Sequence, residues 1–250
     1  MIELEQQYIR LLNEIKNCHS KNAFRSALHH LDKAKILYDL DKEMCVFRAI
    51  TAEEEAASGL MLSLKEGGYK LSNKLKHRDH VHKSAIYPFI SLVQMAFGYS
   101  LKNSCIRLGL AIVDNENEFS LKSYHTIPGL NLYSYPMPPL NFEFKLNGDS
   151  ISYDKQISDY LDHVGEGDIV KYVKDIANIR NKVLYASNDG CPSVEIKKTF
   201  VEGKKRKVLE MLAIYLLTKP YAENQLFVQQ SIYAYLKMLK AISSEIGLVE

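Results

Sequence analysis

The stretch of sequence DIANIRNKVLYASNDG runs from Asp175 to Gly190, and the expected helical fold is organised around it. Apolar residues recur in it at the i, i+3, i+4 spacing of a helix: Ile176, Ile179, Val183 and Leu184. The stretch ends in an Asn-Asp-Gly cluster that is typical of a turn. The last helical turns therefore bring together a cation, an amide and a phenol, which are Arg180, Asn181 and Tyr185.

The 250 residues are typical of one domain and can bury about 70 to 75% of the surface of the unfolded chain. Four scattered cysteines without a CxxC pair indicate neither a disulfide framework nor a zinc knuckle. The formal net charge of +2 argues against bulk nucleic-acid binding, while a local basic patch stays open. The N-terminus lacks the features of a signal peptide, and no apolar run reaches the ~20 residues of a spanning helix. We expect a cytoplasmic protein without membrane contact.

Helical periodicity covers most of the chain outside its middle. Two amphipathic helices joined near Cys18 to Asn22 should form a helical hairpin within residues 1–40. A helix over 43–64 should end at Gly67-Gly68, and Pro88 fits the first turn of a helix over 84–100. Further helices are expected at residues 155–163, in the Asp175 stretch, at 206–218 and at 223–247.

The period changes between residues 105 and 154. Alternating apolar residues before a turn cluster at 114–117 predict one hairpin, and Asn147-Gly148 between alternating residues predicts a second. Because an isolated hairpin is marginal in water, we expect both to combine into one small sheet packed on the helices.

The predicted fold class is therefore mainly α, a helical bundle with an inserted small antiparallel β-sheet (α+β). One compact domain is expected, in which residues 1–104 hold the helical hairpin and the first half of the bundle. Residues 105–154 form the β insertion, and residues 155–250 form the second half of the bundle.

Three consecutive glutamates, Glu53 to Glu55, fall on the helix expected at 43–64. At about 100° per residue they spread over about 200°, so at least one carboxylate should point near the buried side. One interpretation is a solvated acidic face, because unpaired carboxylates are rarely buried. The other is a carboxylate that pairs with a buried cation such as Arg180.

The densest group of titratable side chains lies at residues 74–83 and includes three histidines. On a helix His80 and His82 would lie about 200° apart, so only His77 and His80 share a face. Two histidines without a second ligand motif are weak support for zinc, and we predict neither a metal nor another cofactor. We interpret the segment as the start of a helix whose side chains could face a cleft or a phosphate backbone.

A polar and basic segment at residues 193–207 overlaps the start of the helix expected at 206–218. It contains Lys204, Lys205, Arg206 and Lys207. A basic run is usually a solvated surface, but beside an RNA-cleaving site this one could hold phosphates.

Three short blocks carry a resemblance to a known family. They are Ala-x-Glu-Glu at Ala52 to Glu55, His-x-x-Lys at His80 to Lys83, and Arg-Asn-x-x-Leu-Tyr-Ala-Ser at Arg180 to Ser187. In this order they resemble the HEPN superfamily, particularly its AbiV-like abortive-infection branch. The resemblance implies a compact helical bundle, commonly dimeric, whose active members cleave RNA without metal by means of an arginine and a histidine that follows it closely.

This chain departs from the family pattern at two positions. Arg180 matches the family arginine and Asn181 the polar residue after it, but Tyr185 stands at the histidine position. Ser58 stands where a lysine is expected after the paired glutamates.

Metal-free RNA cleavage needs a base for the 2′-hydroxyl proton, an acid for the 5′-oxygen and a cation for the charge on phosphorus. Arg180 suits the cationic role, because its planar fork binds phosphate. Tyrosine is a poor base at neutral pH, so His80 or His82 would supply the imidazole if the helices converge. The expected catalytic residues are Arg180, Asn181, Tyr185, Glu54 and His80, and the expected RNA-binding residues are Lys83, Lys204, Lys205, Arg206 and Lys207.

Two other hypotheses belong to different classes of protein. In a catalytically inactive HEPN-like scaffold, Arg180 would form a buried ion pair with Glu54 or Glu55, and the molecule would bind a protein partner or a ligand. In a metal hydrolase, His77, His80 and Glu54 would hold the ion. For the ribonuclease hypothesis the resemblance implies RNA as the partner and a homodimer as the assembly.

Overall fold

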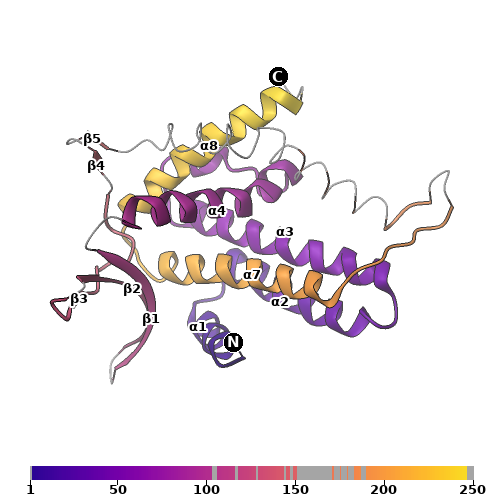
Figure 1. Ribbon diagram of the computed structural model, residues 1–250, viewed down its shortest axis with the longest axis horizontal. Helices are drawn as coiled ribbons and strands as arrows, with labels where there is room; N and C mark the ends of the chain where they lie inside the picture. Colours follow the sequence, from indigo (N-terminus) through magenta and orange to yellow (C-terminus); the bar gives the residue numbers. More distant parts are fainter. Residues whose placement is uncertain are drawn as a thin grey trace.

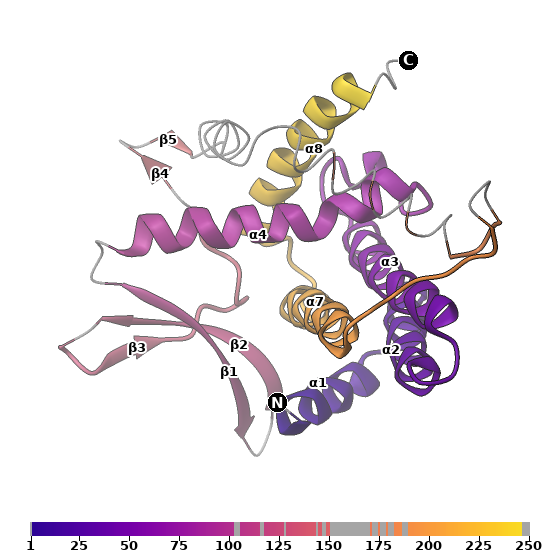
Figure 2. The same cartoon turned by 45° about the vertical axis from the view of Figure 1, so that its right-hand side comes forward.

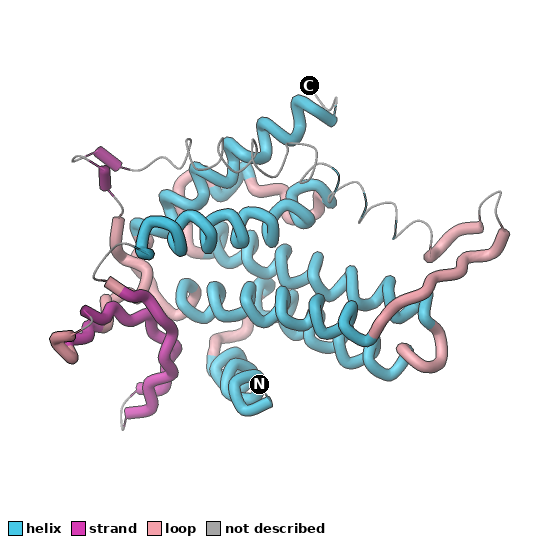
Figure 3. Tube along the Cα trace, viewed as in Figure 1, coloured by secondary structure: helices cyan, strands magenta, loops and turns pink. Residues whose placement is uncertain are grey.

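A computed structural model shows a mainly helical protein with a small antiparallel sheet at one end (Figure 1). It describes residues 2–102, 106–115, 118–127, 129–143, 145–146, 149–150, 171, 175, 179, 183–186 and 190–246. Helices make up most of these residues, and the strands gather at one end of the helical part (Figure 3). The predicted combination of a helical majority and a small antiparallel sheet is confirmed.

Helix α3 (Lys42–Glu66) is the central element of the described fold. Asp41 caps its start, since the Asp41 carboxylate accepts a hydrogen bond of 2.8 Å from the backbone N–H of Met44. The predicted stop at Gly67-Gly68 is confirmed, and Gly68 has the positive φ of 68° that favours glycine. Between Ala52 and Leu64 every residue except Glu55 is buried, as expected of a helix that is surrounded by others.

Helix α2 (His19–Leu37) runs antiparallel along α3 after a short turn. The two backbones approach closely at Gly59, where a Cβ atom would lie 2.8 Å from Cδ2 of Phe24. The hairpin expected within residues 1–40 is thus replaced by a hairpin of α2 and α3. Helix α1 (Ile2–Glu14) instead packs against α7 and β2, since its apolar stripe joins the main core.

Three further helices complete the described helical part: α4 (His80–Lys102), α7 (Lys198–Thr218) and α8 (Leu226–Ile246). Helices α4 and α7 pack on α3, and α8 packs on α4 (Figure 2). Helix α4 begins earlier than expected, so Pro88 lies inside it and the prediction of a first-turn proline is wrong. Helix α7 also begins earlier, because the basic residues before 206 are good helix formers.

The hairpin predicted after residue 105 is confirmed. Strands β1 (Arg107–Asn115) and β2 (Glu118–Ile127) pair antiparallel from Arg107 opposite Thr126 to Asn115 opposite Glu118. The third strand, β3 (Leu132–Ser134), comes from the expected proline-rich connection and pairs with β2.

The prediction that both hairpins form one sheet is wrong. Strands β4 (Lys145–Leu146) and β5 (Asp149–Ser150) form a separate two-stranded unit. A tight reversal at Gly129 and Asn131, both with positive φ, returns the chain to β2 first, and β3 therefore occupies the edge that the second hairpin would need.

One large apolar core unites the described helices and part of the sheet. It includes residues of α1, α2, α3, α4, α7 and α8, together with Leu121 of β2. Among the helices of the described residues, none combines the length and apolarity that crossing a bilayer requires.

Candidate functional site

A buried carboxylate lies between α3 and the start of α4. Oε1 of Glu54 is 3.0 Å from Nδ1 of His80, and Oε2 of Glu54 is 3.2 Å from Nζ of Lys83. We refer to Glu54, His80 and Lys83 as the Glu54 cluster. In the sequence, His80 and Lys83 follow Glu54 by 26 and 29 residues, so the cluster joins two distant segments.

Helix capping explains why His80 and Lys83 face the same carboxylate. Oδ1 of Asp79 accepts hydrogen bonds from the backbone N–H groups of Val81, at 2.8 Å, and His82, at 3.2 Å. Asp79 thereby fixes the start of α4, and His80 and Lys83 share one side of its first turns at the i, i+3 spacing. A helix N-terminus also attracts negative charge, which favours a carboxylate at this place.

The three side chains differ in their access to solvent. The side chain of His80 is 55% exposed, whereas those of Glu54 and Lys83 are 9% and 10% exposed. A carboxylate oxygen accepts a hydrogen bond, so Nδ1 of His80 carries the proton and Nε2 is the basic nitrogen of the neutral ring. A carboxylate that orients an accessible imidazole is the arrangement that general acid–base catalysis uses.

Ser58 connects the cluster to the segment that precedes α4. Its hydroxyl lies 2.9 Å from the carbonyl oxygen of Glu54 and 3.0 Å from that of His77. At the position where the family resemblance leads one to expect a lysine, the serine therefore holds the start of the histidine-rich segment against α3.

The histidines do not converge on one point. Nδ1 of His77 lies 3.5 Å from Nζ of Lys65, and burial together with the charge of Lys65 lowers the pKa of His77. Nδ1 of His82 accepts a hydrogen bond of 3.2 Å from the backbone N–H of Lys76. Within the described part of the chain, no group of three or more His, Cys, Asp or Glu side chains could hold a metal ion.

The third block is described only in part. Arg180 and Asn181 lie outside the described residues. Val183 is buried against Val46 and Ile50, which lie about two turns and one turn before Glu54 on α3. The side chain of Tyr185 is exposed. The expected pairing of Arg180 with Glu54 thus stays a prediction, and the structure shows Lys83 and His80 as partners of that carboxylate.

A second buried carboxylate lies beside the first on α3. Oε1 of Glu53 is 3.3 Å from Nζ of Lys207, and Oε2 of Glu53 accepts a hydrogen bond from Lys204. Nζ of Lys207 also lies 4.4 Å from the centre of the Tyr87 ring, and burial lowers the pKa of Lys207. Two of the three consecutive glutamates are therefore buried and paired, which overturns the interpretation of a solvated acidic face.

The expected basic surface run at residues 204–207 is also corrected. Because a helix turns about 100° per residue, the four side chains point in different directions. Lys204 and Lys207 face Glu53 in the interior. Nζ of Lys205 lies 2.5 Å from Oε2 of Glu5. Arg206 is exposed, and its Nε lies 3.8 Å from Oε1 of Glu210. A shared spacing could have signalled this, since Lys204 and Lys207, like His80 and Lys83, lie three residues apart on one helix face.

Comparison with known proteins adds no relative: no protein family, curated protein or solved structure matches this chain. Its own fold and site define it as a mainly helical protein with a small antiparallel sheet, in which a buried glutamate orients an exposed histidine.

Proposed function

We propose that this protein is a HEPN-like, AbiV-related ribonuclease of a phage-defence or toxin-type system, which cleaves RNA without a metal ion. One observation supports the proposal most. Two of the three blocks that resemble the family, separated by more than twenty residues, meet at the carboxylate of Glu54. Val183 of the third block packs against Val46 and Ile50 of α3, which lie about two turns and one turn before Glu54.

The chemistry assigns one role to each group. Nε2 of His80 takes the 2′-hydroxyl proton, the 2′-oxygen attacks phosphorus, and the bond from phosphorus to the 5′-oxygen breaks. The imidazolium that forms is stabilised by Glu54, and a proton returns to the 5′-oxygen, which yields a 2′,3′-cyclic phosphate and a 5′-hydroxyl. Arg180 would stabilise the charge on phosphorus, with Asn181 and Tyr185 as further contacts to RNA.

The remaining parts of the proposal concern surroundings and assembly. Lys83 adds positive potential beside His80, while the exposed Arg206 is the member of the 204–207 run best suited to contact phosphate. The proposal also includes a homodimer, as the family resemblance implies, and a cytoplasmic location, as the sequence analysis predicts.

A catalytically inactive scaffold is the second candidate, and the pairing of Glu54 with Lys83 favours it. Both side chains are almost fully buried, so this ion pair acts as a fixed contact between α3 and α4. In a scaffold the cluster would set helix register, and the molecule would bind a protein partner or ligand without cleaving RNA.

Cleavage of single-stranded RNA by the purified protein in excess chelator tests the proposal. The expected products carry 2′,3′-cyclic phosphate ends, and Arg180→Ala should cleave at least about 100-fold more slowly. Arg25→Ala, which removes an exposed arginine from α2, serves as the matched control and should retain full activity. Undiminished cleavage by Arg180→Ala would exclude this site, and an inert wild-type protein would favour the scaffold.

A further inference from the structure

A large apolar cavity lies between the sheet and the helices, apart from the Glu54 cluster. Its volume is about 480 Å³, and its wall combines side chains of α3, α4, α7 and α8 with strand β1 and Ser123 of β2. We propose that this cavity binds the hydrocarbon chain of a single-chain amphiphile.

The chemistry of the wall selects an apolar occupant. Among the described residues, those that line the cavity carry no charge, and most are aliphatic or aromatic, for example Leu60, Phe89, Val93 and Val228. A volume of this size lies within the range of about 300–1,000 Å³ that is typical of small-molecule sites. Since the cost of an empty apolar void grows with its volume, the fold gains stability when an apolar group fills this space.

The hydroxyl groups of the wall are already engaged by the protein. Thr218 donates to the carbonyl of Ile214 at 2.7 Å, and Ser231 donates to the carbonyl of Phe227 at 2.8 Å. The hydroxyls of Ser123 and Tyr235 likewise donate to the backbone carbonyls of Pro139 and His82. A polar group placed inside would compete with these bonds, so the part of the ligand that enters should be a hydrocarbon.

One end of the cavity adjoins a second hollow of about 280 Å³. Both spaces are lined by Gln94, Leu110, Ile214 and Leu217, and Gln94 and Leu110 are exposed. The second hollow is also lined by two acids and two bases: Glu202, Glu210, Lys205 and Arg206. A hydrocarbon chain that fills the cavity can therefore leave the head group of the amphiphile at the second hollow. The positive and negative side chains there are equal in number, which fits either an acidic or an uncharged head group.

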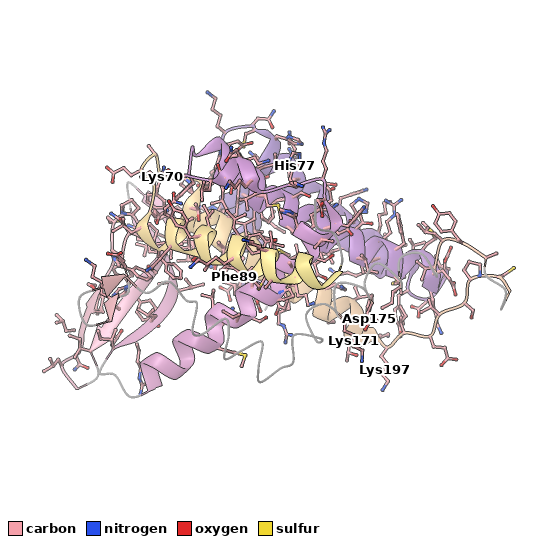
Figure 4. The ribbon with its side chains drawn as sticks, turned by 90° about the horizontal axis from the view of Figure 1, so that it is seen from above. Lys70, His77, Phe89, Lys171, Asp175 and Lys197 are labelled. Carbon is pink, nitrogen blue, oxygen red and sulfur yellow. The ribbon has the colours of Figure 1, made fainter. Side chains whose placement is uncertain are left out.

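The cavity also contacts the helix that carries His80, because α4 supplies part of its wall. The rings of Phe89 and Tyr235, both in the wall, lie 5.3 Å apart in an edge-to-face arrangement, and Figure 4 shows Phe89 beneath α8. The hydroxyl of Tyr235 holds the carbonyl of His82 in the first turn of α4. An occupant should therefore stabilise the contact between α4 and α8, a property that is measurable whether or not the protein cleaves RNA.

The test uses the purified full-length protein and the uncharged fluorescent probe N-phenyl-1-naphthylamine. We expect saturable binding of the probe, displacement by both dodecanol and dodecanoic acid, and a higher melting temperature with either amphiphile. Val93→Phe and Ser231→Leu each fill part of the cavity from a different helix and should weaken probe binding by about tenfold or more. Val194→Phe, at a half-buried valine outside the cavity, is the matched control and should bind as the wild type does.

Each alternative outcome has a distinct meaning. If dodecanoic acid displaced the probe and dodecanol did not, the protein would recognise the carboxylate. This result would overturn the proposal that it recognises the hydrocarbon chain. Probe binding that is absent, or unchanged in folded Val93→Phe and Ser231→Leu, would exclude the cavity as the binding site. If one filling variant does not fold, the other decides, because the two substitutions enter from α4 and α8 independently.

Discussion

Glu54 neutralises one buried lysine and orients one exposed histidine with a single carboxylate. The side chains of Glu54 and Lys83 are nearly as inaccessible as the apolar core around them. Two charges in such a place are tolerated because each has the other as a partner, whereas a single charge there is costly. The same reasoning applies to Glu53, whose partners come from α7.

Replacement of Glu54 by alanine should therefore destabilise the protein strongly. Glu54→Ala leaves Lys83 buried without its carboxylate, and we expect a loss of about 3–5 kcal/mol in the free energy of unfolding. Glu54→Leu combined with Lys83→Met removes both charges and should recover most of that loss. Urea unfolding measures all variants, with Glu55→Ala as the control, which should stay within about 0.5 kcal/mol of the wild type. Equal costs for Glu54→Ala and Glu55→Ala would contradict the buried pair.

His82 should make the stability depend on pH. Burial lowers the pKa of His82, although the carboxylate of Asp79 opposes this shift. A histidine with a lowered pKa stabilises the fold fully above its unfolded pKa of about 6.5, and this contribution is lost as the pH falls below that value. Protonation at Nδ1 would also break the hydrogen bond from Lys76.

The free energy of unfolding, measured in urea at about pH 7.5 and about pH 5.5, tests this expectation. The wild type should lose more stability on acidification than His82→Asn, which keeps an acceptor but does not titrate. The same loss in both proteins would show that His82 does not contribute to the pH dependence.

At the scale of elements, the contact between α2 and α3 depends on Gly59. A Cβ atom there would lie 2.8 Å from Cδ2 of Phe24 and 3.1 Å from the carbonyl oxygen of Ser20. The first atom belongs to a fully buried ring and the second to the backbone, so neither can yield easily. The glycine lets two helices pack at a distance that no other residue would permit.

A matched pair of glycine substitutions tests this contact. Gly59→Ala should destabilise the protein by about 1–3 kcal/mol through overpacking, despite the better helix propensity of alanine. Gly203→Ala in α7, where an added Cβ meets no atom within 4 Å, should instead stabilise it by about 0.5–1 kcal/mol. Thermal or urea unfolding provides the values, and a gain of stability in both variants would show that α2 and α3 are not closely packed at Gly59.

Local signals predicted some elements well and others poorly. The spacing of apolar residues and the stop at Gly67-Gly68 were sufficient to predict α3. Alternating apolar residues around a turn cluster were sufficient to predict the hairpin of β1 and β2. The predicted start of α4 at residue 84 is wrong because it assigns Pro88 to the first helical turn, whereas the cap at Asp79 begins the helix earlier. Strand β3 was missed because the prolines and glycine on either side of it suggested a connection. Pairing with the edge of β2 forms this strand, and its own short sequence does not indicate it.

At the scale of the whole molecule, the candidate site was predictable only where a family resemblance linked distant segments. It named Glu54, His80 and Lys83, which the structure brings together, but periodicity alone could not have paired α3 with the start of α4. The lysines of α7 were misinterpreted for the same reason. Their charge suggested that these lysines face solvent or bind RNA. Only the packing of α7 on α3 shows that Lys204 and Lys207 pair with the buried carboxylate of Glu53.

In the proposed function, His80, oriented by Glu54, performs acid–base chemistry on RNA. The most direct measurement is the initial rate of RNA cleavage in excess chelator by the wild type, His80→Ala and His29→Ala, the last of which removes an exposed histidine from α2. We expect His80→Ala to be slower by a factor of about 100 to 10,000, and His29→Ala to keep the wild-type rate. A His80→Ala protein that has the wild-type circular dichroism spectrum and cleaves RNA at the wild-type rate would contradict the proposed function.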